Sequence, residues 1–270
     1  MGRISRALNK CADGQFLLLA GDLTNDGKDV QFLKLKEILE KEIPEIPVFS
    51  VSGNHDYPIL PIPYIETDIC SYYTFQEWLK VRNERLGVLW QQDESGAYAI
   101  QMENVDIIGL NATSHWRRFV FQQGKQLEWL EDFLQNSSAK WHVIICHAPL
   151  TEHNPLRING TSRIYLSRDG ELQRILDKHQ NVIFISGHTH VSPNIPEGGV
   201  DYDEKHQNIY VNAGSICSNE LKGKEHSAPA EWVDGNIMEI NLTEQMVEIV
   251  SHMIHSDTNS KSQIVFGQKK

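Results

Sequence analysis

Four apolar segments of this chain each lead into side chains of the kinds that bind metal ions, and this repetition constrains the fold more than any other feature. Short apolar runs of this length are typical of buried strands. Ligands gather outside the carboxyl ends of the strands in open α/β sheets, so four strands that end in this way predict one shared site. The runs are residues 16–20, 46–52, 141–145 and 182–186, and the side chains that follow them are Asp22, Asn54, His147, His188 and His190.

Segments with helical periodicity alternate with these strands, which predicts an α/β protein with mixed sheets. The strand, helix and strand over residues 16–52 form a βαβ unit, so Asp22 and Asn54 should follow neighbouring parallel strands. Helices are predicted at residues 4–11, 30–43, 74–86, 126–134 and 171–179. Further strands are predicted at residues 97–102, 105–110, 208–216, 235–242 and 245–253, of which the first two form a hairpin.

The length and charge of the chain exclude several classes of protein. Its 270 residues contain no evident linker, so we expect one domain over residues 1–255 and a polar tail over residues 256–270. A net charge of -11 argues against a nucleic-acid polymer as partner, because binding to a phosphate backbone needs a basic face. The apolar runs are too short to cross a bilayer, and the 4 cysteines are scattered without a CxxC pair. We therefore expect a cytoplasmic protein without a membrane partner.

The expected ligands offer one carboxylate, one amide oxygen and three imidazoles, without a thiolate. Such a set suits Mn²⁺, Fe or Zn²⁺ better than Ca²⁺ or Cu⁺. Asp22 is the expected bridge between two ions, since one carboxylate can give an oxygen to each. A pair of ions would hold a hydroxide nucleophile and neutralise the charge that grows on a phosphoryl group.

His55 follows the expected ligand Asn54, and it is the candidate general acid for the leaving oxygen. Asp56 is the carboxylate expected to orient the His55 ring. The histidines outside these strand ends are interpreted as surface or structural residues, since that is the more common role of a single histidine. Asn212 and Ser215 are interpreted as parts of a turn at a strand end, with a position facing the site as the lesser alternative.

Two segments without clear periodicity are candidates for contact with a substrate. Residues 58–71 are expected to form a loop over the mouth of the site. Arg157 and Asn159 lie in a second loop, where contact with a phosphate competes with the more common interpretation of solvated loop residues.

Four motifs, in this order and spacing, resemble those of the calcineurin-like metallophosphoesterases. They are Gly21-Asp22 with Asp26-Gly27, Gly53-Asn54-His55-Asp56, Cys146-His147, and Gly187-His188-Thr189-His190. The spacing of Asp22 and Asp26 is similar to that of the class III cyclic-nucleotide phosphodiesterases. The resemblance implies a four-layer α/β/β/α sandwich of two mixed sheets with a dinuclear metal site. It also implies that Asp22 bridges two ions, that His55 protonates the leaving group, that His190 binds the second ion, and that the first ion is bound by Asn54, His147 and His188.

The chain departs from that family in one motif, because no Asp-x-His precedes Gly21. The family carries this motif at the end of a first strand, where it helps to bind the second ion. We therefore expect one well-held ion at Asp22 and the three ligands of the first ion, and a weak or empty second position beside His190. We also expect a sheet that lacks its first strand and exposes an edge through which copies of the chain associate. A truncated sequence is the simplest cause and an evolved loss of the strand is the second. The same gap would hide any signal peptide.

The resulting hypothesis is a metal-dependent phosphoesterase for a small phosphorylated substrate, with a phosphodiester as the favoured class. Catalysis would use a metal-activated hydroxide, with His55 as the acid, and would be impaired by the absent motif. The alternative is a non-catalytic descendant that binds a phosphate ligand or a protein through one retained half of the metal site. Other hydrolase classes rank far below, because HExxH, GxSxG and P-loop motifs are absent from the sequence.

Overall fold

A seven-stranded mixed sheet forms the centre of the computed structural model, which describes residues 2–11, 13–57, 70–115, 118–121, 125–156, 165–195, 198–221, 230–256 and 258–266. Its strand order is β10-β11-β9-β8-β5-β4-β3, and β5, β8, β9 and β11 are parallel to one another. All residues of β8 and β9 are buried, as expected for parallel strands with both faces covered. The strands are β3 (Gln91–Gln92), β4 (Tyr98–Gln101), β5 (Val105–Leu110), β8 (Trp141–Cys146), β9 (Val182–Ser186), β10 (Val200–Asp203) and β11 (Asn208–Asn212).

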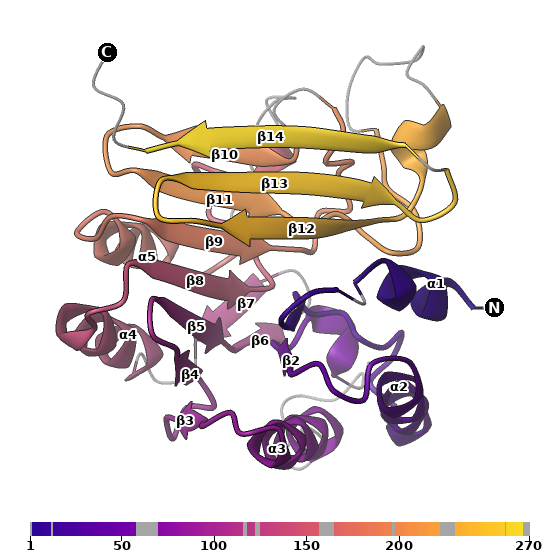
Figure 1. The fold of residues 1–270 in the computed structure, drawn as a ribbon. Helices are drawn as coiled ribbons and strands as arrows, with labels where there is room; N and C mark the ends of the chain where they lie inside the picture. Colours follow the sequence, from indigo (N-terminus) through magenta and orange to yellow (C-terminus); the bar gives the residue numbers. More distant parts are fainter. Residues whose placement is uncertain are drawn as a thin grey trace.

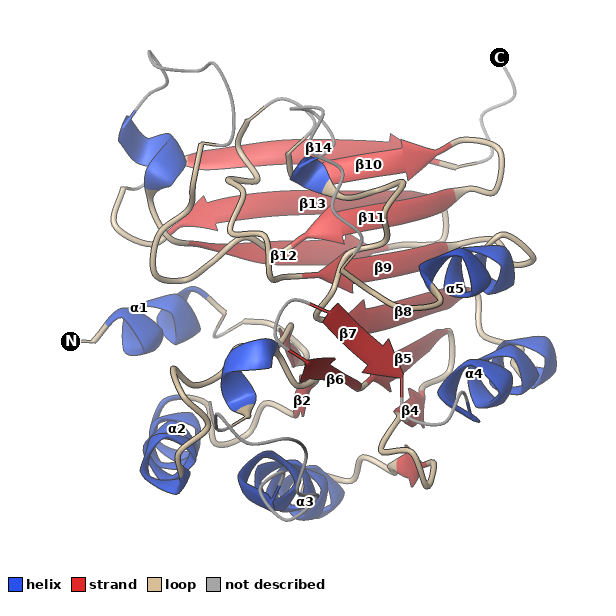
Figure 2. Ribbon diagram, turned by 180° about the vertical axis from the view of Figure 1, so that it is seen from behind, coloured by secondary structure: helices blue, strands red, loops and turns tan. Residues whose placement is uncertain are grey.

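Two helices, α4 (Lys125–Asn136) and α5 (Asp169–Leu176), cover one face of this sheet (Figure 2). Their apolar faces contribute Leu130 and Leu172 to a core cluster that also contains Ile144 of β8 and Phe184 of β9. This packing explains the helical periodicity of both segments, since the same side of each helix meets the sheet along its length.

Two smaller sheets cover the other face (Figure 1). The first pairs β1 (Leu17–Leu19) with β2 (Val48–Ser50) in parallel. The second is an antiparallel sheet of β12 (Asn236–Leu242), β13 (Met246–Met253) and β14 (Asn259–Val265). Phe49 of β2 packs with Ile107 of the large sheet, and Val247 of β13 packs with Val143 of the large sheet.

The fourth layer consists of α1 (Arg3–Lys10), α2 (Asp29–Glu42) and α3 (Cys70–Arg85). Leu39 of α2 and Phe75 of α3 form a cluster with Val48 of β2, so these helices cover the outer face of the β1–β2 sheet. The predicted four-layer α/β/β/α arrangement is therefore confirmed, with the second β layer divided into a parallel and an antiparallel part. An additional antiparallel pair, β6 (Ala112–His115) and β7 (Arg118–Phe121), was not expected from the sequence.

Two boundaries differ from the sequence-based prediction. Residues 259–265 were expected to belong to a frayed polar tail, but they form β14, which pairs along its whole length with β13. The loop expected over residues 58–71 falls largely outside the described residues, and its last two residues begin α3. Within the described ranges, no helix combines the length and the hydropathy needed to cross a membrane.

Candidate metal centre

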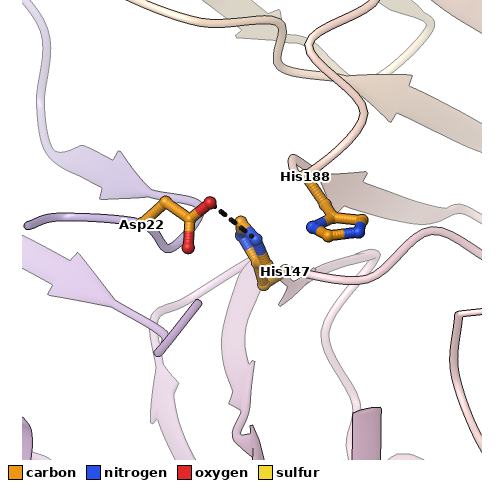
Figure 3. Close-up of side chains that lie close together, drawn as sticks. All are labelled: Asp22, His147 and His188. Atoms are coloured by element: carbon orange, nitrogen blue, oxygen red, sulfur yellow. Dashed lines mark ion pairs between the residues drawn. The ribbon is translucent and has the colours of Figure 1, made fainter. Parts of the chain in front are cut away.

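The carboxyl ends of β1, β8 and β9 meet at one place, as the sequence predicted for strands that share a site. There, Asp22, His147 and His188 bring one potential ligand atom each to within 4.8 Å of the others. Figure 3 shows the His147 ring between the Asp22 carboxylate and the His188 ring. Asp22, which lies more than a hundred positions before the two histidines in the sequence, thus forms one compact group of potential metal ligands with them.

His147 is the most buried member of the group, with 2% of its side chain exposed. Its Nδ1 lies 2.7 Å from the carbonyl oxygen of Ala20. A carbonyl only accepts, so Nδ1 carries a hydrogen, and the lone pair of the neutral ring is on Nε2. Nε2 lies 3.3 Å from Asp22 Oδ2 and is buried without a hydrogen-bond partner. A buried imidazole nitrogen whose polar neighbour is a carboxylate fits a metal ion.

The charges of Asp22 and His147 stabilise each other. Burial opposes the charged form of both groups, but the nearby His147 ring holds the pKa of Asp22 well below its usual range. For His147, burial lowers the pKa, but the Asp22 carboxylate raises it by more, so the pKa of His147 is raised overall. Asp22 is therefore ionised at neutral pH, as a metal ligand must be.

His188 stays uncharged in this position. Burial, together with the nearby His147 ring, lowers the pKa of His188 to about 3. Its Nδ1 lies 2.9 Å from Asn54 Oδ1, which brings the predicted amide ligand to the group. The rings of Phe119 and Tyr165 contact the His188 ring edge-to-face, with centroids 5.0 and 4.6 Å away. A neutral imidazole enclosed by aromatic rings is available to a metal without the loss of a proton.

The backbone of the expected ligands is strained. Asp22, His188 and His190 have positive φ angles of 52°, 65° and 53°, which residues other than glycine rarely adopt. Gly21 also has a positive φ, 86°, and a Cβ there would lie 2.4 Å from His147 Nδ1. Strain of this kind persists where the surrounding structure holds a functional arrangement in place.

Asp56 has a different position from the one expected. Only 1% of it is exposed, and burial raises its pKa to about 6. Its Oδ2 accepts a hydrogen bond from Gly53 N at 2.8 Å, and its Oδ1 accepts one from Thr24 N at 2.9 Å. The carboxylate therefore joins the loop after β1 to the loop after β2, and its contacts do not include the His55 ring.

The His55 ring is oriented by a backbone group instead. Its Nδ1 lies 2.8 Å from the carbonyl oxygen of Asn25. The His55 backbone N–H donates to Asp22 Oδ1 at 2.9 Å, which fixes the carboxylate. The partner expected for the ring was Asp56, and the structure corrects it to the Asn25 carbonyl.

His190, the expected ligand of a second ion, is exposed and lies outside the group of three. It is near enough for its charge to contribute to the lowered pKa of His188. Arg157 and Asn159 fall outside the described residues, so their interpretation stays a prediction.

A second group of potential ligands lies just before β11, at the edge of the large sheet opposite to the Asp22 group. Asp177, Asp203 and His206 bring ligand atoms equally close together, but all three are half-buried. His206 Nδ1 is already paired with Asp203 Oδ2 at 2.6 Å. The buried nitrogen without a partner distinguishes the Asp22 group from this one.

Sequence reasoning missed several groups that shape the site. The carbonyls of Ala20 and Asn25 have no sequence signal, because every residue has such a group. Phe119 and Thr24 reach the site from segments whose position depends on the fold.

The profile of the calcineurin-like phosphoesterase family matches residues 2–192, which include all the expected ligands. The chain belongs to this family. Its membership explains why the strand ends carry Asp, Asn and His in this order, and it implies divalent metal ions at the site.

Two relatives of this calcineurin-like phosphoesterase are named probable cyclic nucleotide phosphodiesterases. The relative from Synechococcus sp. is 25% identical over 175 residues, which cover 64% of this chain and 57% of that protein. The relative from Ruthia magnifica is 23% identical over 200 residues, which cover 73% of this chain and 72% of that protein. The chain thus spans little more than half the length of the first relative.

Solved structures share the fold at low sequence identity. Purple acid phosphatase PPD1 from yellow lupin seeds matches with a TM-score of 0.63 and 14% identity, over 98% of this chain and 49% of that one. GAP50, described as the anchor in the inner membrane complex of Plasmodium, matches with a TM-score of 0.63 and 14% identity, over 99% of this chain and 85% of that one. These similarities concern the fold alone.

Proposed function

We propose that this chain is a divalent-metal-dependent phosphoesterase that hydrolyses a phosphodiester in a small phosphorylated substrate. The observation that carries the proposal is the buried Nε2 of His147, which lies 3.3 Å from the ionised Asp22 carboxylate in one group of potential ligands with His188. Support for the phosphodiester comes from the names of the two relatives, both probable cyclic nucleotide phosphodiesterases.

Four side chains would hold the ion. Asp22 brings an ionised carboxylate, His147 a free Nε2, His188 a neutral ring and Asn54 an amide oxygen 2.9 Å from that ring. Oxygen and nitrogen ligands without sulfur suit Mn²⁺, Fe or Zn²⁺. When bound, such an ion supplies positive charge for the phosphoryl oxygens and lowers the pKa of water. We propose one tightly held ion, with a weaker second position at His190.

His55 would supply the proton of the leaving oxygen. Its Nδ1–H donates to the carbonyl of Asn25, so the ring is fixed and the transferable proton sits on Nε2. The ring is half-buried, and its backbone N–H holds Asp22, which keeps the acid at a constant position relative to the metal ligands. General acids in such positions contribute about 10²- to 10⁴-fold to a rate.

The acidic character of the protein favours small substrates over polymers. With a net charge of -11, the long-range field repels a phosphate polymer, whereas a single phosphate group experiences the local field of a bound cation. The proposed partner is therefore a small phosphorylated molecule, and the proposed location is the cytoplasm.

The proposal is tested by hydrolysis of bis-p-nitrophenyl phosphate with and without Mn²⁺, together with the metal content per chain. We expect metal-stimulated turnover with about one tightly bound ion, and loss of both in Asn54→Ala and His188→Ala. A retained ion without turnover would favour the alternative, a non-catalytic binder of phosphate or protein. A wild-type chain that binds no ion would overturn the proposal.

A further inference from the structure

The loop that carries His188 and His190 is held from behind by one buried amide, that of Asn212 at the end of β11. Asn212 pairs in register with Ser186, the last residue of β9, so its side chain lies where the loop departs from the sheet. It is 5% exposed. A buried amide at this point must be fully hydrogen-bonded, and its partners decide what it stabilises.

The Asn212 amide contacts the middle and the end of this loop. Its Nδ2 donates to the carbonyl of Val191 at 2.9 Å and to the carbonyl of Gly198 at 2.9 Å. Its Oδ1 accepts from Thr189 Oγ1 at 3.4 Å, and Thr189 Oγ1 accepts from Val191 N at 3.3 Å. Thr189, the residue between the two histidines, is thereby drawn inward.

The backbone at both histidines needs such support. His188 and His190 adopt left-handed φ angles of 65° and 53°, and two such residues in one short loop cost free energy unless neighbouring contacts hold them. The contacts at Thr189 and Val191 are adjacent to each of these strained residues. The hydrogen bonds of Asn212 go to the residues around the two histidines and not to their rings, so it acts through the loop.

We infer that Asn212 is a positioning residue that sets the geometry of the His188 and His190 loop and, through it, the affinity for the metal ion. This inference rests on the proposed function, since it concerns the same site. The partners of coordinating groups commonly change metal affinity by about 10- to 100-fold when they are removed.

Asn208 offers a matched control on the same strand. It is fully buried, and its amide also spans two carbonyls, those of Leu176 at 3.1 Å and His179 at 3.2 Å. Its Oδ1 accepts from Val182 N at 3.0 Å, so it holds the beginning of β9, whereas Asn212 holds the loop after its end. Both asparagines should support folding, but only Asn212 should influence the metal.

The experiment compares Asn212→Ala and Asn208→Ala with the wild type, with Co²⁺ and Mn²⁺ as probes. We expect both variants to unfold at lower temperature. Asn212→Ala should lower the metal affinity at least about tenfold and alter the visible Co²⁺ spectrum, while Asn208→Ala keeps the affinity within about twofold.

Thr189→Val serves where Asn212→Ala does not fold, because it keeps the side-chain size and removes the hydroxyl that links the loop to Asn212. It should change the Co²⁺ spectrum and the affinity in the same direction. Wild-type affinity and spectrum in the folded Asn212 or Thr189 variant would overturn the role of Asn212 and leave the proposed function intact. A wild type that binds neither ion would overturn both.

Discussion

The Nδ1 atom of His147 lies 2.7 Å from the carbonyl oxygen of Ala20, and this contact joins the ends of strands in two different sheets. Ala20 follows β1, whereas His147 follows β8 of the large sheet. The contact fixes the ring and directs its Nε2 towards Asp22. The ligand geometry therefore depends on how the two β layers pack.

Metal binding should release about one proton per ion at about pH 5. There His147 is protonated, because Asp22 outweighs the effect of burial and raises its pKa. His188 is neutral, because burial lowers its pKa to about 3, and Asp22 is already ionised. The ion must displace the proton on His147, so the affinity should fall about tenfold per pH unit below the His147 pKa. Calorimetry in buffers of different ionisation enthalpy counts the protons, and a release of two would contradict a neutral His188.

Replacement of Gly21 by alanine should disturb the metal centre as well as the backbone. The new Cβ would lie 2.4 Å from His147 Nδ1 and compete with the Ala20 contact. We expect a loss of unfolding free energy above the roughly 1 to 2 kcal/mol of a left-handed alanine. Metal affinity, measured by titration, should fall about 10- to 100-fold.

Gly87→Ala separates the cost of a left-handed alanine from the effect of the new contact with His147. Gly87 has nearly the same φ, 82°, but a Cβ there meets no atom within 4 Å. This variant should lose roughly 1 to 2 kcal/mol of unfolding free energy and keep the wild-type metal affinity. Equal effects of the two substitutions on metal affinity would show that the His147 contact is unimportant.

The strand ends of the site were predictable because apolar runs and ligand-type residues are both local in sequence. Each run became a strand, and the carboxyl ends of the parallel neighbours β8 and β9 share an edge, which places His147 near His188. Asp22 follows β1 of the other sheet, so its position beside them also depends on how the two β layers pack. The role of Asp56 was not predictable in this way. A buried carboxylate accepts from whichever N–H groups surround it, and the N–H of Thr24 comes from a different loop.

Two other features depend on partners distant in sequence. Polar and apolar residues alternate little over residues 259–265, and most of these residues are exposed. The local sequence therefore does not indicate a strand. They form β14 because β13 offers an edge to pair with, which is a property of context rather than of propensity. Asn212 makes the turn contact that the sequence predicted, since its Oδ1 accepts from Gly214 N at 3.3 Å. Its contacts with Val191 and Gly198 were not predictable, because they exist only in the fold.

We also predict that copies of the chain associate through β1. Leu17 N donates to Pro47 O, and Leu19 O accepts from Val51 N, so both residues face β2. Leu18 then faces the opposite edge, where no strand among the described residues pairs with β1. Unpaired edges of this kind promote pairing between chains. Sedimentation should show larger species at high concentration.

Hydrogen exchange locates the contact. The Leu18 amide should exchange quickly in dilute protein and slowly in concentrated protein, while the Leu19 amide serves as an internal reference at both concentrations. A chain that stays monomeric at every concentration would remove the basis for an edge-to-edge partner.

Replacement of His55 by alanine should reduce turnover according to the leaving group. Without the ring, an alkyl phosphodiester loses the proton donor for a strongly basic leaving oxygen, and its rate should fall about 10²- to 10⁴-fold. A p-nitrophenolate leaves without a proton, so its rate should fall much less. Metal affinity should stay unchanged, because His55 contacts Asp22 through its backbone N–H. His206→Ala is the control. His206 lies just before β11, outside the Asp22 group, so its replacement should change neither rate. Equal losses for both substrates in His55→Ala would mean that this histidine acts on the phosphoryl group and does not protonate the leaving oxygen.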